Sequence, residues 1–214
     1  MAPRPDVSEK RRTEIVEAAA HVFAEKGFDG ARMDDIVQEA GLSKGLLYWY
    51  FKSKDAIIVA LLERLLRPEL DRVQALARAP GAARERLLTF AESMVQDIER
   101  MERLMPITFD FYSIAFRNKT MKKTFREFFR IFTDGIQQVI DQGIGNGEFR
   151  KVDSRRVALA LMAASEGSIL LWVFDRSLSD LAQLRLSMEL ILRGIEHREA
   201  RTARERMGGK GTGE

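Results

Sequence analysis

The sequence predicts an all-α fold, and three observations support this prediction. Apolar residues recur at spacings of three and four along most of the 214-residue chain. Glycine, proline and capping residues such as serine and aspartate stand at the ends of these segments. No stretch alternates apolar and polar residues as a half-buried strand does, and the chain has no internal repeat.

The end signals place the helices in order along the chain. Gly27 ends the first helix, because glycine adopts the left-handed conformation easily. Ser53 caps the fourth, and Pro68 should kink or end it, because proline lacks an amide hydrogen. Pro106 stops the fifth, and Asp153 or the residue after it caps the eighth segment. The expected helices cover about residues 8–26, 32–40, 44–51, 53–76, 82–104, 119–142, 154–174 and 179–198, with a short apolar segment over 107–116 and a glycine loop over 143–147.

The composition is that of a soluble globular protein. Hydrophobic residues make up 45% of the chain and charged residues 31%, which argues against disorder. The absence of cysteine excludes disulfides, thiol catalysis and thiolate metal sites. No apolar run approaches the roughly 20 residues needed to span a bilayer, and the N-terminus lacks a signal peptide, so we expect a cytoplasmic protein. We expect domains over 1–53 and 54–207 and a disordered tail over 208–214.

A tight corner between two short helices is the most informative motif of the chain. Gly41 supplies a helix end and Ser43 a helix start, only two residues apart. Such a corner is typical of the helix-turn-helix arrangement that reads DNA. On the second helix Leu47 lies on one side and Trp49 on the other. From Gly41 onward the segment to residue 54 contains three lysines and no acid, which favours a phosphate backbone as its partner.

Two segments carry a family resemblance, GFDGARMDDI at residues 27–36 and AGLSKGLLYWYF at residues 40–51, followed by Lys-Ser-Lys-Asp. Over residues 10–57 the chain resembles the N-terminal domain of TetR-family transcriptional regulators. The family often has threonine where this chain has Ala31 and then Arg32, so an arginine contact would replace a hydroxyl contact. Leu46 stands where a small polar residue is common, which implies apolar base readout. The resemblance implies DNA contacts by Arg32, Ser43, Lys44, Gly45, Leu46, Tyr48, Trp49, Tyr50 and Lys54. For the basic cluster at residues 10–12, a solvated helix start is nearly as good an interpretation.

The sequence gives no support for catalysis. His21 and His197 are the two histidines, and neither belongs to a metal-ligand spacing. The glycines of residues 143–147 follow a helix rather than a strand, so they indicate a turn rather than a phosphate-binding loop. We therefore expect no catalytic residue, no metal and no cofactor.

Aromatic and methionine residues are concentrated between residues 94 and 132. They fit either a packed core or an apolar cavity between bundle helices, and the family resemblance implies an inducer in such a cavity. Glu166 is the one charged residue between Val157 and Phe174, so it either anchors a ligand or lies at a dimer interface. The candidate ligand-binding residues are Met105, Phe109, Tyr112, Phe128, Phe132, Glu166 and Trp172.

The last two helices are apolar on more than one face. Small residues between 160 and 168 would let another helix approach closely, although an intrachain core would explain them too. TetR-like proteins dimerise through these helices, and two-fold symmetry matches a palindromic operator. The candidate interface residues are Val157, Leu161, Ala164, Ser168, Leu184, Met188, Ile191 and Ile195.

The resemblance therefore implies an N-terminal three-helix DNA-binding domain and a C-terminal helical bundle for ligand binding and dimerisation. The expected protein is a dimeric repressor of a palindromic DNA operator, released by a small apolar or aromatic inducer. An alternative is an activator or architectural DNA-binding protein of the same fold with no small-molecule ligand. Ligand-dependent thermal stabilisation with loss of operator binding would separate the two.

Overall fold

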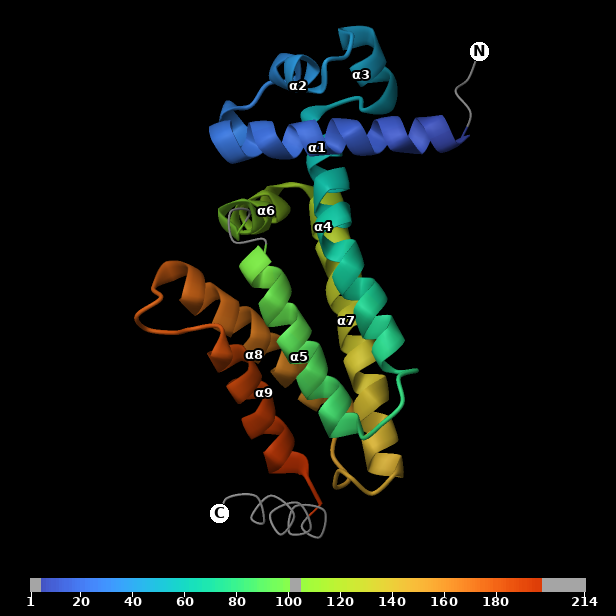
Figure 1. The fold of residues 1–214 in the computed structure, drawn as a ribbon, viewed down its shortest axis with the longest axis vertical. Helices are drawn as coiled ribbons and strands as arrows, with labels where there is room; N and C mark the ends of the chain where they lie inside the picture. Colours follow the sequence, from blue (N-terminus) through green and yellow to red (C-terminus); the bar gives the residue numbers. More distant parts are fainter. Residues whose placement is uncertain (1–4, 101–104, 198–214) are drawn as a thin grey trace, which may run out of the picture. The chain divides into compact units, whose positions relative to one another are not determined.

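The computed structural model of this chain describes residues 5–100 and 105–197, with side chains described for 8–100 and 110–197. Apart from one isolated bridge between Phe149 and Glu196, these residues form no strand pairing. The prediction of an all-α fold is thus confirmed. Within these ranges nine helices follow one another (Figure 1): α1 (Pro5–Gly30), α2 (Met33–Ala40), α3 (Lys44–Tyr50), α4 (Lys54–Leu76), α5 (Ala83–Arg100), α6 (Met105–Arg117), α7 (Lys119–Gly145), α8 (Ser154–Phe174) and α9 (Ala182–Ile195).

The chain divides into two compact units. The first comprises Met1–Pro68 and Arg103–Glu127, and the second comprises Glu69–Glu102 and Phe128–Glu214. This division differs from the boundary after residue 53 that the sequence predicts, because α6 and the start of α7 join the N-terminal helices. The tail from residue 208 lies outside the described residues.

The first unit is built on the buried side of α1. Ile15 and Phe23 are buried there, and the ring of Phe28 packs against that of Phe23 at a centroid distance of 4.8 Å. Gly27 permits this return of the chain, because its φ of 68° lies in the left-handed region. The Phe28 ring also lies 5.0 Å from the ring of Phe111 on α6. These ring contacts explain why α6 belongs to the N-terminal unit.

Helix α4 begins as the sequence predicts and continues through its proline. The hydroxyl oxygen of Ser53 accepts a hydrogen bond from the amide of Ala56 over 3.2 Å, so it caps the helix. Pro68 lies inside α4 and does not end it, since the helix continues to Leu76. The carbonyl of Arg64 loses its helical amide partner there, because proline has no amide hydrogen.

Two buried arginines hold the second unit together, in which α9 packs against α5 and α8. Arg84, at the start of α5, forms ion pairs with Glu189 at 2.9 Å and Glu196 at 2.8 Å. Arg86 donates to the carbonyl oxygen of Leu76 over 3.0 Å and so satisfies the end of α4. Both arginines are more than nine-tenths buried; Arg84 is ion-paired, and Arg86 is satisfied by backbone carbonyls and by the side-chain oxygen of Gln142.

Two helix ends differ from the prediction. Helix α7 continues through Gly143, where the sequence predicts a loop. A Cβ at this position would lie 2.4 Å from the ring of Phe149, so glycine here allows close packing rather than a turn. Before α9, the carboxylate of Asp180 accepts the amide of Gln183 over 3.1 Å. Ser179, where the sequence predicts the last helix to begin, is buried, and its hydroxyl donates to the carbonyl of Asp180 over 3.3 Å.

Candidate nucleic-acid interface

The corner between α2 and α3 forms as its two end signals predict. Gly41 takes the left-handed conformation, with φ of 61°, and its amide bonds back to the carbonyl of Gln38. The hydroxyl of Ser43 accepts a hydrogen bond from the amide of Leu46 over 3.3 Å and caps α3. Ser43 therefore fixes the start of the helix that presents the candidate DNA-binding residues.

The start of α2 is fixed by Asp35. Its carboxylate accepts the backbone amide of Arg32 and the ammonium group of Lys26, both over 2.8 Å. These hydrogen bonds, that from Lys26 foremost, hold the pKa of Asp35 below its usual value. The Arg32 side chain remains exposed, which leaves it available for a phosphate.

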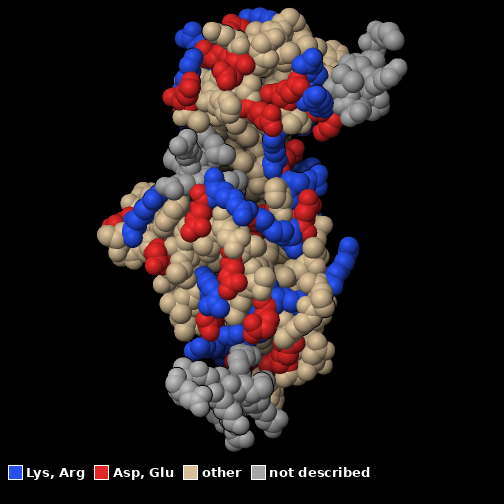
Figure 2. All heavy atoms as spheres, in the orientation of Figure 1, with Lys and Arg blue, Asp and Glu red and all other residues tan. Residues whose placement is uncertain are grey.

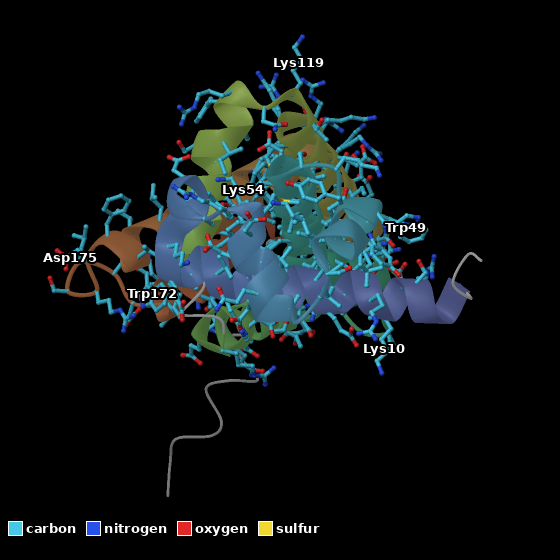
Figure 3. The ribbon with its side chains drawn as sticks, turned by 90° about the horizontal axis from the view of Figure 1, so that it is seen from above. Lys10, Trp49, Lys54, Lys119, Trp172 and Asp175 are labelled. Carbon is cyan, nitrogen blue, oxygen red and sulfur yellow. The ribbon has the colours of Figure 1, made fainter. Side chains whose placement is uncertain are left out.

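Helix α3 has a buried and an exposed side, as the sequence predicts. Leu47 is fully buried, whereas Tyr48 is 37% and Trp49 52% exposed. The Trp49 ring meets the Tyr50 ring edge-on at 4.6 Å, and Figure 3 shows the Trp49 side chain at the periphery of the helices. A Cβ on Gly45 would meet no atom within 4 Å, so a partner can approach the backbone closely there.

The three lysines of this segment do not form a uniformly basic surface. Lys44 forms an ion pair with Asp34 at 2.7 Å, and its hydrogen bond to this carboxylate raises the pKa of Lys44. The ammonium group of Lys52 donates to the carbonyl of Tyr48 over 2.9 Å. On the face drawn in Figure 2, basic and acidic side chains are interspersed over the N-terminal helices.

Lys54 has a different position from the one expected. Its partly buried ammonium group donates to the carbonyl oxygens of Phe28 and of Ala31, the latter at 2.9 Å. It therefore satisfies backbone acceptors between α1 and α2. The expected Lys54–phosphate contact stays a prediction. The sequence gives no signal for this role, because the acceptors lie more than twenty positions earlier in the chain.

The basic cluster at the start of α1 is partly engaged in intrachain contacts. Arg11 pairs with Glu14 at 2.6 Å, and the guanidinium of Arg12 lies 5.0 Å from the centre of the Phe51 ring. Lys10 is exposed. Arg12 thus packs on Phe51, the residue that follows the last turn of α3. The residues next to Arg12 in the sequence do not indicate this contact.

Two family profiles match this chain. Residues 15–61 match bacterial regulatory proteins of the tetR family, and residues 83–197 match the C-terminal part of BetI-type transcriptional repressors. The chain belongs to the TetR family of transcriptional regulators. The identification from residues 27–36 and 40–51 is confirmed.

Individual proteins resemble this TetR-family regulator over most of its length. An uncharacterised HTH-type transcriptional regulator, YfiR of Bacillus subtilis, is 26% identical over 87% of this chain and 92% of its own. FadR of Bacillus subtilis in complex with stearoyl-CoA has a TM-score of 0.73 at 22% identity, over 86% of this chain and 99% of its own. A putative regulator from Saccharomonospora viridis in complex with choline has a TM-score of 0.76 at 23% identity, over 89% of this chain and 100% of its own. The two structures share the fold with this regulator.

The candidate ligand-binding residues of this TetR-family regulator fall in both units. Tyr112 belongs to the first unit, where its ring stacks on Phe125 at 4.7 Å. Phe128 and Phe132 belong to the second unit, are buried, and lie 5.9 Å apart between ring centroids. Trp172, also in the second unit, is buried beneath the guanidinium of Arg176 at 4.7 Å. The side chains of Met105 and Phe109 lie outside the described residues.

A cluster of charged residues in the second unit was missed from the sequence. Arg72 pairs with Glu69 at 2.6 Å and also with Asp97. Burial raises the pKa of Glu69 against the influence of Arg72, and the charge of Glu166 raises it further. Within the described part of the chain, Glu69 Oε1 and Arg72 Nε are buried and have no hydrogen-bond partner. The available signal was the spacing of Glu69 and Arg72, which places both on one side of α4.

The candidate dimerisation residues differ in how far they are buried within the single chain. Five of the eight are buried inside the single chain, where they pack α8 and α9 into the second unit: Leu161, Ser168, Leu184, Met188 and Ile195. Val157, Ala164 and Ile191 are half-buried. Both helices carry a second apolar side, and periodicity alone does not indicate which side faces inward. The exposed large apolar residues here are Leu159, Leu170, Leu171, Phe174, Leu178, Leu186 and Leu190.

The exposed side of α8 is notable because this helix is very apolar. Among the described helices, α8 is the one with the length and hydropathy of a membrane span, with a mean hydropathy of 1.9. In its most apolar stretch 28% of the residues are buried within the chain. Core helices and spans share such a composition, and in this chain Glu166 interrupts it.

Proposed function

We propose that this regulator is a repressor that binds a palindromic operator as a homodimer and leaves it when a small apolar molecule binds the second unit. The observation that carries the proposal is the arrangement of α3. Tyr48 and Trp49 face solvent, while Leu47 and Phe51 are buried behind them. Exposed aromatic side chains on a helix of a helix-turn-helix unit need a partner, and the edges of base pairs and the sugar–phosphate backbone supply it.

Each exposed residue of the corner has a separate role in this proposal. Trp49 and Tyr48 contact bases and sugars, and Leu46 supplies apolar contact with a thymine methyl group. Lys44 and Arg32 bind phosphates; Lys44 exchanges its pairing with Asp34 for a phosphate when DNA is bound. This exchange of partners costs little free energy, because the side chains of both Lys44 and Asp34 are exposed to solvent.

Dimerisation through α8 and α9 is supported by their exposed apolar residues. Phe174 is 80% exposed and Leu190 57%, in a chain whose other large apolar side chains are mostly buried. Large apolar side chains that are exposed in the single chain are expected at an interaction site. A two-fold dimer would place two α3 helices roughly 34–36 Å apart, the spacing of successive major grooves.

The ligand-binding proposal rests on the second unit. Phe90, Phe128 and Phe132 supply neighbouring aromatic rings. Glu69 Oε1 and Arg72 Nε supply one free acceptor and one free donor within the described residues. A ligand with an apolar body and a hydroxyl or amide group would satisfy both. Glu166 is half-buried on α8, and its charge raises the pKa of Glu69, so we propose it as a further polar group for this ligand.

The structural relatives show how different the ligands of this fold are, since one binds stearoyl-CoA and another choline. Both compounds are therefore useful first probes for this regulator. A ligand should raise the melting temperature and weaken operator binding in parallel, because it favours the state that does not bind DNA.

The experiment begins with DNA fragments selected by the protein from its own genome, which define the operator. Operator binding is then measured with and without each probe, together with thermal stability. A palindromic site, released by a compound that also raises the melting temperature, supports the proposal. Operator binding that no stabilising compound weakens would instead favour the ligand-independent alternative.

A further inference from the structure

A second basic surface lies in the first unit, outside the helix-turn-helix corner. Four exposed cationic residues at the start of α7 follow the spacing i, i+3, i+4 and i+7, which places them on one side of the helix. Exposed Arg117 precedes them at the end of α6. We call this set the α7 basic face: Arg117, Lys119, Lys122, Lys123 and Arg126. Figure 3 shows Lys119 projecting outward from the ribbon.

No member of the α7 basic face forms an ion pair within the described residues. The opposite side of the same two turns is apolar and buried, with Met121 and Phe125 in the core. A solvated helix face normally mixes both signs of charge, as Arg130 and Asp134 do further along α7 at 3.0 Å. From Arg117 to Glu127, five basic residues stand against one exposed acid, Glu127, so the start of α7 carries an excess of positive charge.

The arrangement is unfavourable for the helix itself. Lys122 and Lys123 lie close to the N-terminus of α7, whose partial positive charge favours acidic residues, and its first turn contains none. Lys119 and Lys123 repel each other at i, i+4, and so do Lys122 and Arg126. Asn118 caps the helix by accepting the amide of Met121 over 3.0 Å. Residues that oppose local stability in this way are expected where function requires them.

The α7 basic face is joined to the DNA-reading part of the first unit. The side-chain amide of Asn118 donates a hydrogen bond over 2.9 Å to the carboxylate of Asp55, which lies in the first turn of α4. Arg117 and Asn118 also line one surface depression together with Lys54 and Asp55. Three residues separate the end of α3 at Tyr50 from the start of α4 at Lys54, so the basic face starts beside the end of the helix-turn-helix corner.

We propose that the α7 basic face binds the phosphate backbone of duplex DNA outside the groove that α3 reads. Charge complementarity and continuity with the helix-turn-helix corner favour DNA over other anionic partners. Cations that face phosphates release counterions on binding, so they add affinity without adding sequence preference. The inference rests on operator binding by α3, and it adds a second, sequence-independent contact to it.

The test is the variant in which Lys119, Lys122 and Lys123 are all changed to Gln. Operator binding is measured over a range of salt concentrations, on the bare palindrome and on a duplex extended by roughly one helical turn, about 10 base pairs, at each side. On the extended duplex we expect about ten-fold weaker binding at low salt and a salt slope shallower by about one per lysine. On the bare palindrome we expect wild-type binding.

A matched control removes the same charge from the second unit, by changing Lys151, Arg155 and Arg156 to Gln. It should bind both duplexes as the wild type does, which separates a local contact from an effect of net charge. The triple lysine variant should melt no lower than the wild type, because its substitutions remove repulsion within α7.

Equal affinity and salt slope of the variant and the wild type on the extended duplex would overturn the proposal. Phe116, 86% exposed beside Arg117, offers another partner for this face, an anionic bilayer. Binding to phosphatidylglycerol vesicles that is lost in the lysine variant and in Phe116→Ala, with the DNA salt slope unchanged, would assign the face to membranes instead. Recognition by α3 is tested separately by Trp49→Ala, and intact operator binding in that variant would contradict it. The salt slopes of the wild type and the triple lysine variant on random duplex DNA would then still test the α7 basic face.

Discussion

The ammonium group of Lys54 donates a hydrogen bond to the carbonyl oxygen of Ala31 over 2.9 Å. This bond ties the first residue of α4 to the turn that precedes α2. The same group also contacts the carbonyl of Phe28. A lysine in a DNA-reading segment thus serves the internal structure of that segment.

Changing Lys54 to Met should therefore destabilise the protein. The substitution keeps the aliphatic stem and leaves partly buried carbonyl oxygens without a donor, which costs about 1–3 kcal/mol. Thermal or urea unfolding measures this loss. The salt slope of operator binding should stay the same, because no phosphate contact is removed.

Lys52→Met is the control for Lys54, since its bond to the Tyr48 carbonyl is exposed. It should leave the melting temperature almost unchanged. An unaltered melting temperature for Lys54→Met, combined with a salt slope lower by about one, would restore the phosphate assignment.

Trp49→Ala should leave the fold intact and weaken operator binding by about 1–3 kcal/mol, the range for a specific base contact or stacking residue. The reason is its exposure, which shows that the ring contributes little to the core. Calorimetry and a binding titration separate the two effects.

Leu47→Ala is the opposite case on the same helix. Its side chain is fully buried, so truncation should cost about 2–5 kcal/mol of stability. Reversed outcomes for Trp49 and Leu47 would show that the wrong side of α3 had been assigned to DNA.

The raised pKa of Glu69 predicts a pH-dependent contribution to stability. Burial makes the folded state bind this proton more tightly than the unfolded chain does. The stabilising contribution is full below the ordinary pKa of 4.5 and is lost as the pH rises through the raised value. The glutamine in the Glu69→Gln variant does not titrate. The difference in melting temperature, wild type minus variant, should therefore decrease from about pH 4 to about pH 7.

Asp35→Asn should show the opposite sign. The hydrogen bonds from Lys26 and Arg32 lower the pKa of Asp35, so its contribution is present above 3.8 and lost as the pH falls through the lowered value. The difference between wild type and this variant should therefore grow with pH. Profiles that rise or fall together for the two variants would contradict at least one of the two assignments.

Leu190→Lys and Phe174→Lys should give folded monomers. Both residues are exposed in the single chain, so a charge there should not destabilise the folded monomer. It should destabilise the dimer, because dimerisation would bury the charge. Sedimentation measures the association state, and circular dichroism measures the helix content. Leu184→Ala, at a fully buried position on α9, should instead lower stability. Dimers that persist in both lysine variants would place the interface elsewhere.

Local signals in the sequence were sufficient for the corner of the helix-turn-helix. Gly41, Ser43 and Ser53 act within four residues of themselves, and the structure confirms each of their end positions. The inward and outward sides of α3 follow from periodicity alone. These features depend on the chain near them and little on the rest of the fold.

Roles that depend on distant partners could not be obtained in the same way. Lys54 binds carbonyls 23 and 26 positions earlier, and Arg72 pairs with Asp97 of another helix. Periodicity does not separate the buried from the exposed candidates for dimerisation, because α8 and α9 are apolar on two sides. Choosing between those sides requires knowing which one packs against α5, and periodicity does not contain that information.

The ion pairs of Arg84 determine how far the chain can be shortened. This guanidinium holds Glu196, and the amide of His197 bonds to the carbonyl of Glu148 over 3.0 Å. The carboxylate of Glu148 in turn accepts the amide of Ala83 at the start of α5. A protein ending at His197 keeps this whole chain of bonds. One ending before Glu196 leaves a buried guanidinium short of a carboxylate, so residues 196 and 197 help to hold the start of α5 in place.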